Sequence, residues 1–165
     1  MPDSKKSIRV LFVCLGNICR SPSAEAVMNA QVRDAGLGSV IHCDSAGTSG
    51  NHDGETADPR SIMHGEKRNY DLSSISRKFI AHKDFSHFNY IIVMDDKNLE
   101  DVLRQDLEKT YRSKVFKMTD FSSSKTHNFV PDPYYTGADG FETVLDILEE
   151  ACAGLLLQIR KDHAL

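Results

Sequence analysis

A potential nucleophile and a permanently charged cation lie six positions apart near the N-terminus. The segment VCLGNICRSP, residues 13–22, contains the thiol of Cys14 and the guanidinium of Arg20. A cysteine at the end of an apolar strand is usually only a small hydrophobic residue, and this spacing alone arises often by chance. The complete string, placed where a strand gives way to a helix, indicates an anion-binding loop instead.

The loop 14–20 has the composition of a phosphate cradle. Backbone N–H groups that curl ahead of a helix point at an anion, and the helix dipole adds partial positive charge. Arg20 adds a fork that matches two phosphate oxygens. Gly16 and Asn17 tolerate the left-handed backbone that the curl requires. The same dipoles stabilise a thiolate, so Cys14 is expected to be an ionised nucleophile. The other predicted members of the loop are Leu15, Ile18, Cys19 and Ser21.

An aspartate in the segment FVPDPYY, residues 129–135, can supply a proton to such a reaction. Phenol has a pKa near 10, so expelling a phenolate at neutral pH calls for a general acid. Asp132 can serve if a bound phosphate keeps its carboxyl protonated, and Pro133 restricts it to an extended backbone. An Asp-Pro pair is ordinarily a turn, and only the presence of Cys14 and Arg20 favours the catalytic interpretation.

Two tyrosines follow this aspartate directly. Tyr134 and Tyr135 are candidate walls for a flat aromatic substrate, because aromatic rings stack well on one another. Packing of the loop is the competing interpretation, and for Tyr135 the two are about equally well supported by the sequence.

The elements that must position these residues alternate along the chain. Apolar runs predict strands at 8–13, 40–47, 89–94 and 114–118, and helices are predicted at 21–36, 57–70, 95–107 and from about residue 139 onward. Asp58 and Pro59 suit the start of the second helix, and Asp139 with Glu142 suggests a capping box on the last. This alternation predicts an α/β fold, a three-layer α/β/α arrangement around a parallel sheet, in one domain spanning 1–165.

Charge and composition exclude several classes of protein. The formal charge of −4 argues against nucleic-acid binding, and no run approaches the roughly 18 apolar residues that span a bilayer. The lysines before the run 8–14 look like a secretory signal, but Arg9 interrupts the run and no cleavage pattern follows it. We therefore expect a cytoplasmic protein with reduced thiols. Neither the four cysteines nor the seven histidines have a metal-ligand spacing, so no metal or other cofactor is expected.

The chain resembles the low-molecular-weight protein tyrosine phosphatases. The likeness rests on VCLGNICRSP and DPYY, and it extends through CDSAGTSG (43–50), ADPR (57–60) and DFSHFNYIIVMDDKNL (84–99), in the order of the family. The resemblance implies a four-stranded parallel sheet and metal-free hydrolysis of phosphotyrosine through a cysteinyl-phosphate intermediate. It also implies phosphotyrosine-containing proteins as substrates.

The resemblance assigns roles to individual positions. Cys14 matches the nucleophile, Arg20 the phosphate-binding arginine and Asp132 the general acid. Ser21 matches a hydroxyl that stabilises the thiolate. Asp95 matches an aspartate that we take to be structural support.

Other matched positions support the loop or form the rim of the site. Asn17 matches a left-handed loop residue held by side-chain hydrogen bonds, one of them from Ser45. A histidine that supports this asparagine in some members is replaced near Ser74, and the rim position that is aromatic in many relatives is Asn51. These departures leave the chemistry in place, but peptide preference cannot be carried over.

Three alternatives remain to be separated from a phosphotyrosine phosphatase. An arsenate reductase of the same fold needs a further cysteine pair on a mobile segment, whereas Cys43 and Cys152 fall in a predicted strand and helix. A phosphoarginine phosphatase favours a smaller polar residue than Ile18. A non-catalytic phosphotyrosine-binding module is expected to lack Cys14 or Asp132, and both are present.

The second cysteine of the loop suggests redox sensitivity. An accessible thiolate is the kind that peroxide converts to sulfenic acid, and a neighbouring thiol can then form a disulfide with it. Cys14 and Cys19 share one tight turn, so we expect reversible inactivation by peroxide. Loop packing is the competing interpretation of Cys19.

Overall fold

The sheet contains four parallel strands, as predicted. The computed structural model describes residues 7–165, so the first six residues of the predicted domain 1–165 lie outside the described residues. The strands are β1 (Ile8–Cys14), β2 (Ile41–Gly47), β3 (Tyr90–Val93) and β4 (Val115–Lys117). Their order in the sheet is β2-β1-β3-β4, and each neighbouring pair is parallel. The carboxyl ends of all four strands therefore lie at one edge, where ligands bind in sheets of this kind.

Residues 7–165 also form five helices and three short 3-10 segments, of which η2, η3 and α5 follow the last strand. The helices are α1 (Arg20–Asp34), α2 (Pro59–Glu66), α3 (Ala81–His87), α4 (Asp96–Arg104) and α5 (Ala138–His163), and the 3-10 segments are η1 (Arg112–Lys114), η2 (Met118–Phe121) and η3 (Pro133–Tyr135). The sequence did not predict α3, which has seven residues and no side-chain cap at its start. So short a helix has no apolar periodicity to detect.

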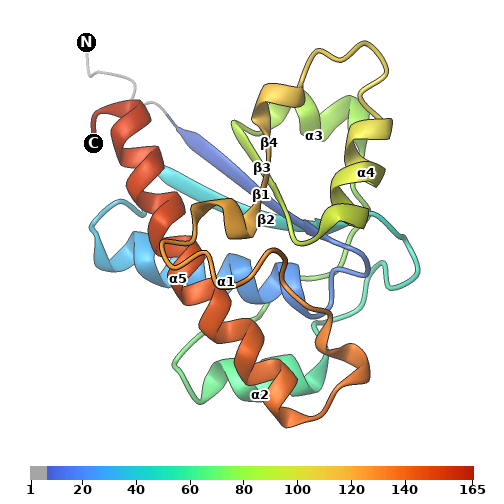
Figure 1. The fold of residues 1–165 in the computed structure, drawn as a ribbon, viewed down its shortest axis with the longest axis vertical. Coiled ribbons are helices and arrows are strands. Elements are labelled where there is room, and N and C mark those ends of the chain that lie inside the picture. The colour runs from blue at the N-terminus through green and yellow to red at the C-terminus, as the bar shows by residue number, and fades with distance from the viewer. Residues whose placement is uncertain (1–6) are drawn as a thin grey trace.

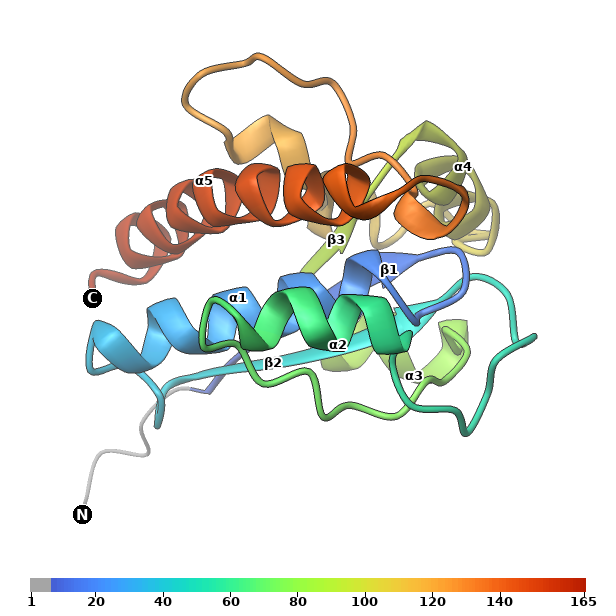
Figure 2. The same cartoon turned by 90° about the horizontal axis from the view of Figure 1, so that it is seen from below.

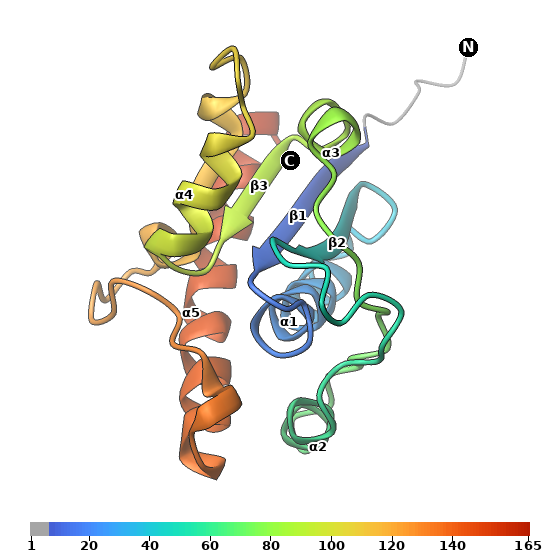
Figure 3. The same cartoon turned by 90° about the vertical axis from the view of Figure 1, so that its right-hand side faces the viewer.

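The two faces of the sheet carry separate cores, which confirms the three-layer α/β/α prediction. Val10 and Phe12 of β1 pack with residues of α1 and α5, whereas Leu11 and Val13 pack with residues of α3 and α4. Successive residues of a strand point to opposite faces, so β1, buried on both, is apolar throughout its central part. Figures 1 and 3 show the strands between the two helical layers.

The apolar face predicted for the last helix is confirmed, but its predicted capping box is wrong. The eight predicted core residues, from Phe141 to Ile159, are all buried. However, α5 begins at Ala138 with Gly137 as its N-cap, and no side chain caps it. Asp139 is thus already inside the first turn, where its charge suits the helix dipole. At the start of α2, by contrast, Asp58 is the N-cap and accepts a hydrogen bond from the Arg60 backbone N–H, as expected.

Helix α2 extends the layer formed by α1 and α5. It packs against α5, and Ala26 of α1 clusters with Ala57 and Leu72 on either side of α2. Figure 2 shows α2 alongside α1, below α5. Among residues 7–165, no helix has both the length and the apolar content that a membrane span requires.

A carboxyl group is buried between α1 and β2. Glu25 lies close to Asp44 and Ser45 of β2 and to Arg77, and its Oε1 atom is fully buried without a hydrogen-bond partner among residues 7–165. Burial raises the pKa of Glu25 to about 7, and Asp44 adds to the rise, while the Ser45 hydroxyl and Arg77 oppose it. Glu25 is therefore easier to protonate in the folded protein than in the unfolded chain.

The raised pKa of Glu25 predicts a loss of stability as the pH rises. The folded state holds the proton more tightly, so the free energy of unfolding falls between about pH 4.5 and pH 7. Glu25→Gln removes this titration and should match wild type at pH 4, yet exceed it by about 1–3 kcal/mol at pH 8. Urea unfolding at both pH values measures the difference. Glu108→Gln, at an exposed position, is the control and should show no pH-dependent change. A Glu25→Gln variant that gains nothing at pH 8 would contradict the prediction.

Candidate active site

The predicted anion-binding loop lies at the carboxyl edge of the sheet. Strand β1 ends at Cys14 and α1 begins at Arg20, so the loop occupies the position where anions bind in such folds. The chain after β2 runs beside it, because Thr48 and Ser49 donate backbone hydrogen bonds to the carbonyls of Cys14 and Leu15, both at 2.9 Å. Gly47 permits this approach, since a Cβ there would lie 2.7 Å from the Leu15 carbonyl oxygen.

The Cys14 sulfur lies at the base of the loop. The Asn17 backbone N–H donates to it over 3.3 Å, and the Ser21 hydroxyl lies 3.0 Å away. Hydrogen bonds of this kind stabilise negative charge on an acceptor. The position of Ser21 beside the sulfur agrees with the role that the family resemblance gives it.

Asn17 adopts the expected left-handed backbone, with a φ of 56°. Its Nδ2 donates to Ser21 Oγ at 2.7 Å, and its Oδ1 accepts from the Arg77 backbone N–H at 3.0 Å. The predicted bond from Ser45 is wrong: the Ser45 hydroxyl is buried without a hydrogen-bond partner among residues 7–165. Oδ1 accepts from the Arg77 backbone instead, and Ser45 lies close to Glu25.

Arg20 is buried, and its charge is balanced from a neighbouring loop. Its Nη1 donates to Asp95 Oδ2 at 2.6 Å and to the Val130 carbonyl at 3.1 Å. Asp95 is also the N-cap of α4, where it accepts from the Asn98 backbone N–H. Burial lowers the pKa of Arg20, but Cys14 and Asp95 outweigh it, so the net shift is upward.

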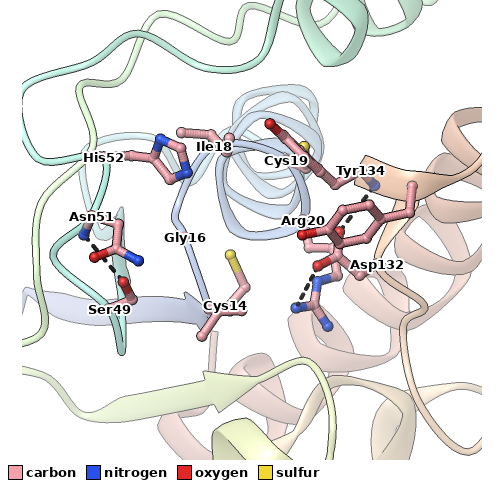
Figure 4. A pocket seen from close by; sticks show the side chains of 12 residues that line it. Cys14, Gly16, Ile18, Cys19, Arg20, Ser49, Asn51, His52, Asp132 and Tyr134 are labelled. Atoms are coloured by element: carbon pink, nitrogen blue, oxygen red, sulfur yellow. Dashed lines mark hydrogen bonds and ion pairs between the residues drawn. The ribbon is translucent and has the colours of Figure 1, made fainter.

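The segment that carries Asp132 faces the loop from the other side. Its backbone is tied to the end of β3, because Val130 donates to the Met94 carbonyl at 2.8 Å. The Asp132 carboxylate lies 3.7 Å from Arg20 Nη2 and accepts from the Tyr134 backbone N–H at 3.0 Å. In Figure 4, Asp132 and Tyr134 lie on the Arg20 side of the pocket, opposite Asn51 and His52, with the Cys14 sulfur between them.

These side chains enclose one cavity of about 190 Å³. This volume suits a small group, since pockets for drug-sized ligands start near 300 Å³. Ten predicted site residues line the cavity: Cys14, Leu15, Gly16, Ile18, Cys19, Arg20, Asn51, Asp132, Tyr134 and Tyr135. The other four, Asn17, Ser21, Ser45 and Asp95, lie behind it. Asn17, Ser21 and Asp95 hydrogen-bond to the loop or to Arg20, and Ser45 makes no such bond.

Sequence reasoning missed two residues that line the cavity. Ser49 and His52 flank the predicted rim residue Asn51, and proximity to that position was the one signal for them. His52 lies over the loop, since a Cβ on Gly16 would be 3.1 Å from its ring, and its Nδ1 is 2.7 Å from Glu55 Oε2. The cavity thus has a polar side formed by Asn51 and His52 and an aromatic side formed by Tyr134 and Tyr135.

Cys19 lies in the wall of this cavity. It is buried, and it clusters with Ile18 and Phe141. Burial raises the pKa of Cys19 to about 12, against a smaller opposing effect of a hydrogen bond with Ser61. The Cys19 thiol therefore remains protonated at neutral pH. Within residues 7–165, no three His, Cys, Asp or Glu side chains are grouped as a metal site would require.

Comparison with known proteins agrees with this geometry. Residues 9–165 match the family model for low molecular weight phosphotyrosine protein phosphatases. A low molecular weight protein-tyrosine-phosphatase of Streptomyces coelicolor is 42% identical, with 93% of this chain and 94% of the relative covered. The low molecular weight phosphotyrosine protein phosphatase of Homo sapiens is 38% identical, with 89% and 92% covered.

A solved structure extends the comparison to three dimensions. The protein tyrosine phosphatase of Entamoeba histolytica, crystallised with Hepes in its active site, superposes with a TM-score of 0.91 at 45% identity. The match covers 95% of this chain and 99% of the other. The predicted resemblance is therefore confirmed, and this chain belongs to the low molecular weight phosphotyrosine protein phosphatase family.

Proposed function

We propose that this protein tyrosine phosphatase uses Cys14 as nucleophile, Arg20 to bind the phosphate and Asp132 as general acid. The observation that carries the proposal is the convergence of these three side chains on one cavity. The sulfur lies at the base of the loop, and the carboxylate lies on the Arg20 side of the cavity, beside Tyr134 (Figure 4). A phosphoryl group between them would have its attacking and leaving atoms on opposite sides, as in-line displacement requires.

The reaction would proceed in two balanced steps. The Cys14 sulfur attacks phosphorus while the bond to the phenolic oxygen breaks, and Asp132 gives its proton to that oxygen. Asp132, now a carboxylate, then takes a proton from a water whose oxygen attacks phosphorus. The sulfur–phosphorus bond breaks, which releases phosphate and restores the thiolate. Arg20 and the loop N–H groups hold the three phosphate oxygens throughout.

The alternatives fit the site less well. An arsenate reductase passes oxidation to further thiols, but Cys43 and Cys152 do not line the cavity, and burial raises the pKa of Cys43 to about 12. A phosphoarginine phosphatase is disfavoured by Ile18, which occupies the cavity wall. A non-catalytic binding module has no need of Cys14 with Asp132.

We also propose a domain organisation, a class of substrate and a cellular location. Residues 1–165 would act as one domain on phosphotyrosine-containing proteins, without a cofactor and without nucleic acid. One sheet covered by helices on both faces supports a single domain, and the net charge of −4 weighs against a nucleic-acid partner. The free cysteines of the described chain are typical of a reducing compartment such as the cytoplasm.

The role of Asp132 can be tested with substrates of graded leaving-group acidity. Asp132→Asn should lower kcat on phosphotyrosine by about 10²–10⁴-fold, because its phenolate needs a proton to leave. The loss should shrink toward tenfold or less for aryl phosphates with strongly acidic phenols, which leave unaided. Steady-state kinetics across the series, with EDTA present, measures this. Cys14→Ser should be inactive on every substrate and serves as the control. An equal loss across the series would assign Asp132 a structural role, and turnover in Cys14→Ser would overturn the mechanism.

We further propose that Cys19 protects Cys14 from irreversible oxidation. Peroxide would oxidise the Cys14 thiolate to sulfenic acid, with reduction of peroxide to water. The Cys19 thiol would then attack the sulfenic sulfur and release a second water, which leaves a disulfide. Both cysteines line one cavity, which supports this step.

Recovery after peroxide treatment tests this redox role. Wild type should regain most activity with dithiothreitol, and inorganic phosphate should protect it by occupying the loop. Cys19→Ser should recover several-fold less, relative to its own activity before treatment, because its sulfenic acid oxidises further. Cys43→Ser, which alters a thiol outside the cavity, is the matched control and should recover like wild type. Equal recovery in Cys19→Ser, with no Cys14–Cys19 linkage in the mass spectrum, would return Cys19 to a packing role.

A further inference from the structure

An arginine outside the cavity lies against two aromatic rings. The guanidinium carbon of Arg60, near the start of α2, is 5.3 Å from the centroid of the Tyr134 ring and 4.9 Å from that of Phe141. Both distances fall within the range of cation–π interactions. Arg60 does not line the cavity, whereas Tyr134 does. Arg60 is therefore placed to affect the substrate through the Tyr134 ring.

The guanidinium is fixed in orientation by Asp58. Arg60 Nε donates to Asp58 Oδ1 at 3.1 Å, and Nη2 donates to Oδ2 at 2.9 Å, so the pair is bidentate. The Asp58 side chain is buried, and the hydrogen bond from Arg60 lowers its pKa. A planar group held at two points presents its face in one direction, which a flexible lysine cannot do.

Both supports of Arg60 are joined to the phosphate loop. The Asp58 backbone N–H donates to the Ile18 carbonyl at 2.8 Å. Phe141, the second ring, is buried in a cluster with Ile18 and Cys19. Arg60 is therefore connected to the phosphate loop through Asp58 and Phe141, and the Tyr134 ring packs on Arg60.

The Tyr134 ring has little other support. Its side chain is 40% exposed, and its other aromatic contact is Tyr135, which is 88% exposed. Its backbone is fixed by Pro133 and by the hydrogen bond to Asp132, but these contacts do not set the side-chain rotamer. The contact with Arg60 connects this ring to the phosphate loop, because Asp58 holds Arg60 and hydrogen-bonds to Ile18.

We propose that Arg60 is a positioning residue that sets the affinity for the aryl part of the substrate by holding the Tyr134 ring at a fixed distance from the phosphate loop. The inference rests on the proposed role of Tyr134 as a wall of the site. The phosphate itself contacts the loop 14–20 and does not depend on Tyr134. Loss of Arg60 should therefore weaken the binding of aryl phosphates and leave the binding of inorganic phosphate unchanged.

The decisive measurement separates these two affinities. Arg60→Met keeps the length of the side chain and removes its charge and planarity. The KM for phosphotyrosine should rise about two- to five-fold, the size of an exposed cation–π contact, with kcat within two-fold of wild type. The inhibition constant of inorganic phosphate should stay at its wild-type value. In a Tyr134→Leu background, the same change should have no further effect on KM, since the contact is already lost.

Two further variants complete the design. Arg60→Lys retains a cation that can pair with Asp58, so it controls for misfolding caused by loss of that ion pair. Its KM should lie between those of wild type and Arg60→Met, because the planar guanidinium that stacks on Tyr134 is absent. Arg104→Met removes an exposed arginine on α4 and should match wild type. An unchanged KM in Arg60→Met, or an equal rise in the Tyr134→Leu background, would overturn the inference. So would a parallel rise in the phosphate inhibition constant, because Arg60 would then act on the phosphate loop. If the wild-type protein did not hydrolyse phosphotyrosine at all, the proposed function would be refuted instead.

Discussion

The burial of Arg20 is the constraint on which the arrangement of the site depends. A guanidinium removed from water needs a counter-charge and hydrogen-bond acceptors close by. Asp95 supplies the charge from the loop after β3, and the Val130 carbonyl supplies a second acceptor. Val130 is itself bonded to Met94, at the end of β3. The loop after β1, the loop after β3 and the Asp132 segment therefore meet around one buried cation.

The curvature of the loop depends on a second group of contacts. Asn17 is held in a left-handed conformation, which is unfavourable for a residue with a Cβ. Its amide bridges Ser21 and the Arg77 backbone N–H, while the Arg77 side chain pairs with Asp44 and Asp84, each at 3.0 Å. Arg77 thus connects the loop to β2 and α3. Local strain at Asn17 persists because these surrounding elements over-determine its position.

Much of the fold followed from the sequence, because burial leaves a periodic pattern. The four strands and the apolar face of α5 repeat at the expected spacing, and Asp58 and Pro59 mark the start of α2 by their local chemistry. Helix α3 was not predicted because its seven residues contain too few turns to show a repeat of apolar residues. The cap of α5 was misplaced because a glycine can start a helix without any side-chain signal.

The residues that line the cavity were largely predictable, and the contacts behind them were not. Cys14 and Arg20 reveal themselves by residue type and spacing within one loop. The support of Asn17 comes from the backbone of Arg77, and no side-chain identity specifies a backbone donor. Ser45 was assigned that role by the family resemblance, and the identity of a residue does not determine where its hydroxyl points. Arg60 lies in the segment ADPR but received no role, because its partners, Tyr134 and Phe141, lie more than 70 positions away.

In the proposed function, the phosphate and aryl parts of the site depend on different kinds of interaction. Backbone hydrogen bonds between strand ends and loops hold the phosphate cradle, including those from Thr48, Ser49 and Asp58. Such contacts come with the fold and survive most side-chain substitutions. The aryl wall, by contrast, is a partly exposed tyrosine that rests on one arginine. Opposite it, Asn51 and His52 take the place of an aromatic rim. If the proposed roles hold, substitutions at these few positions change which aryl phosphate is accepted without disturbing the chemistry at Cys14.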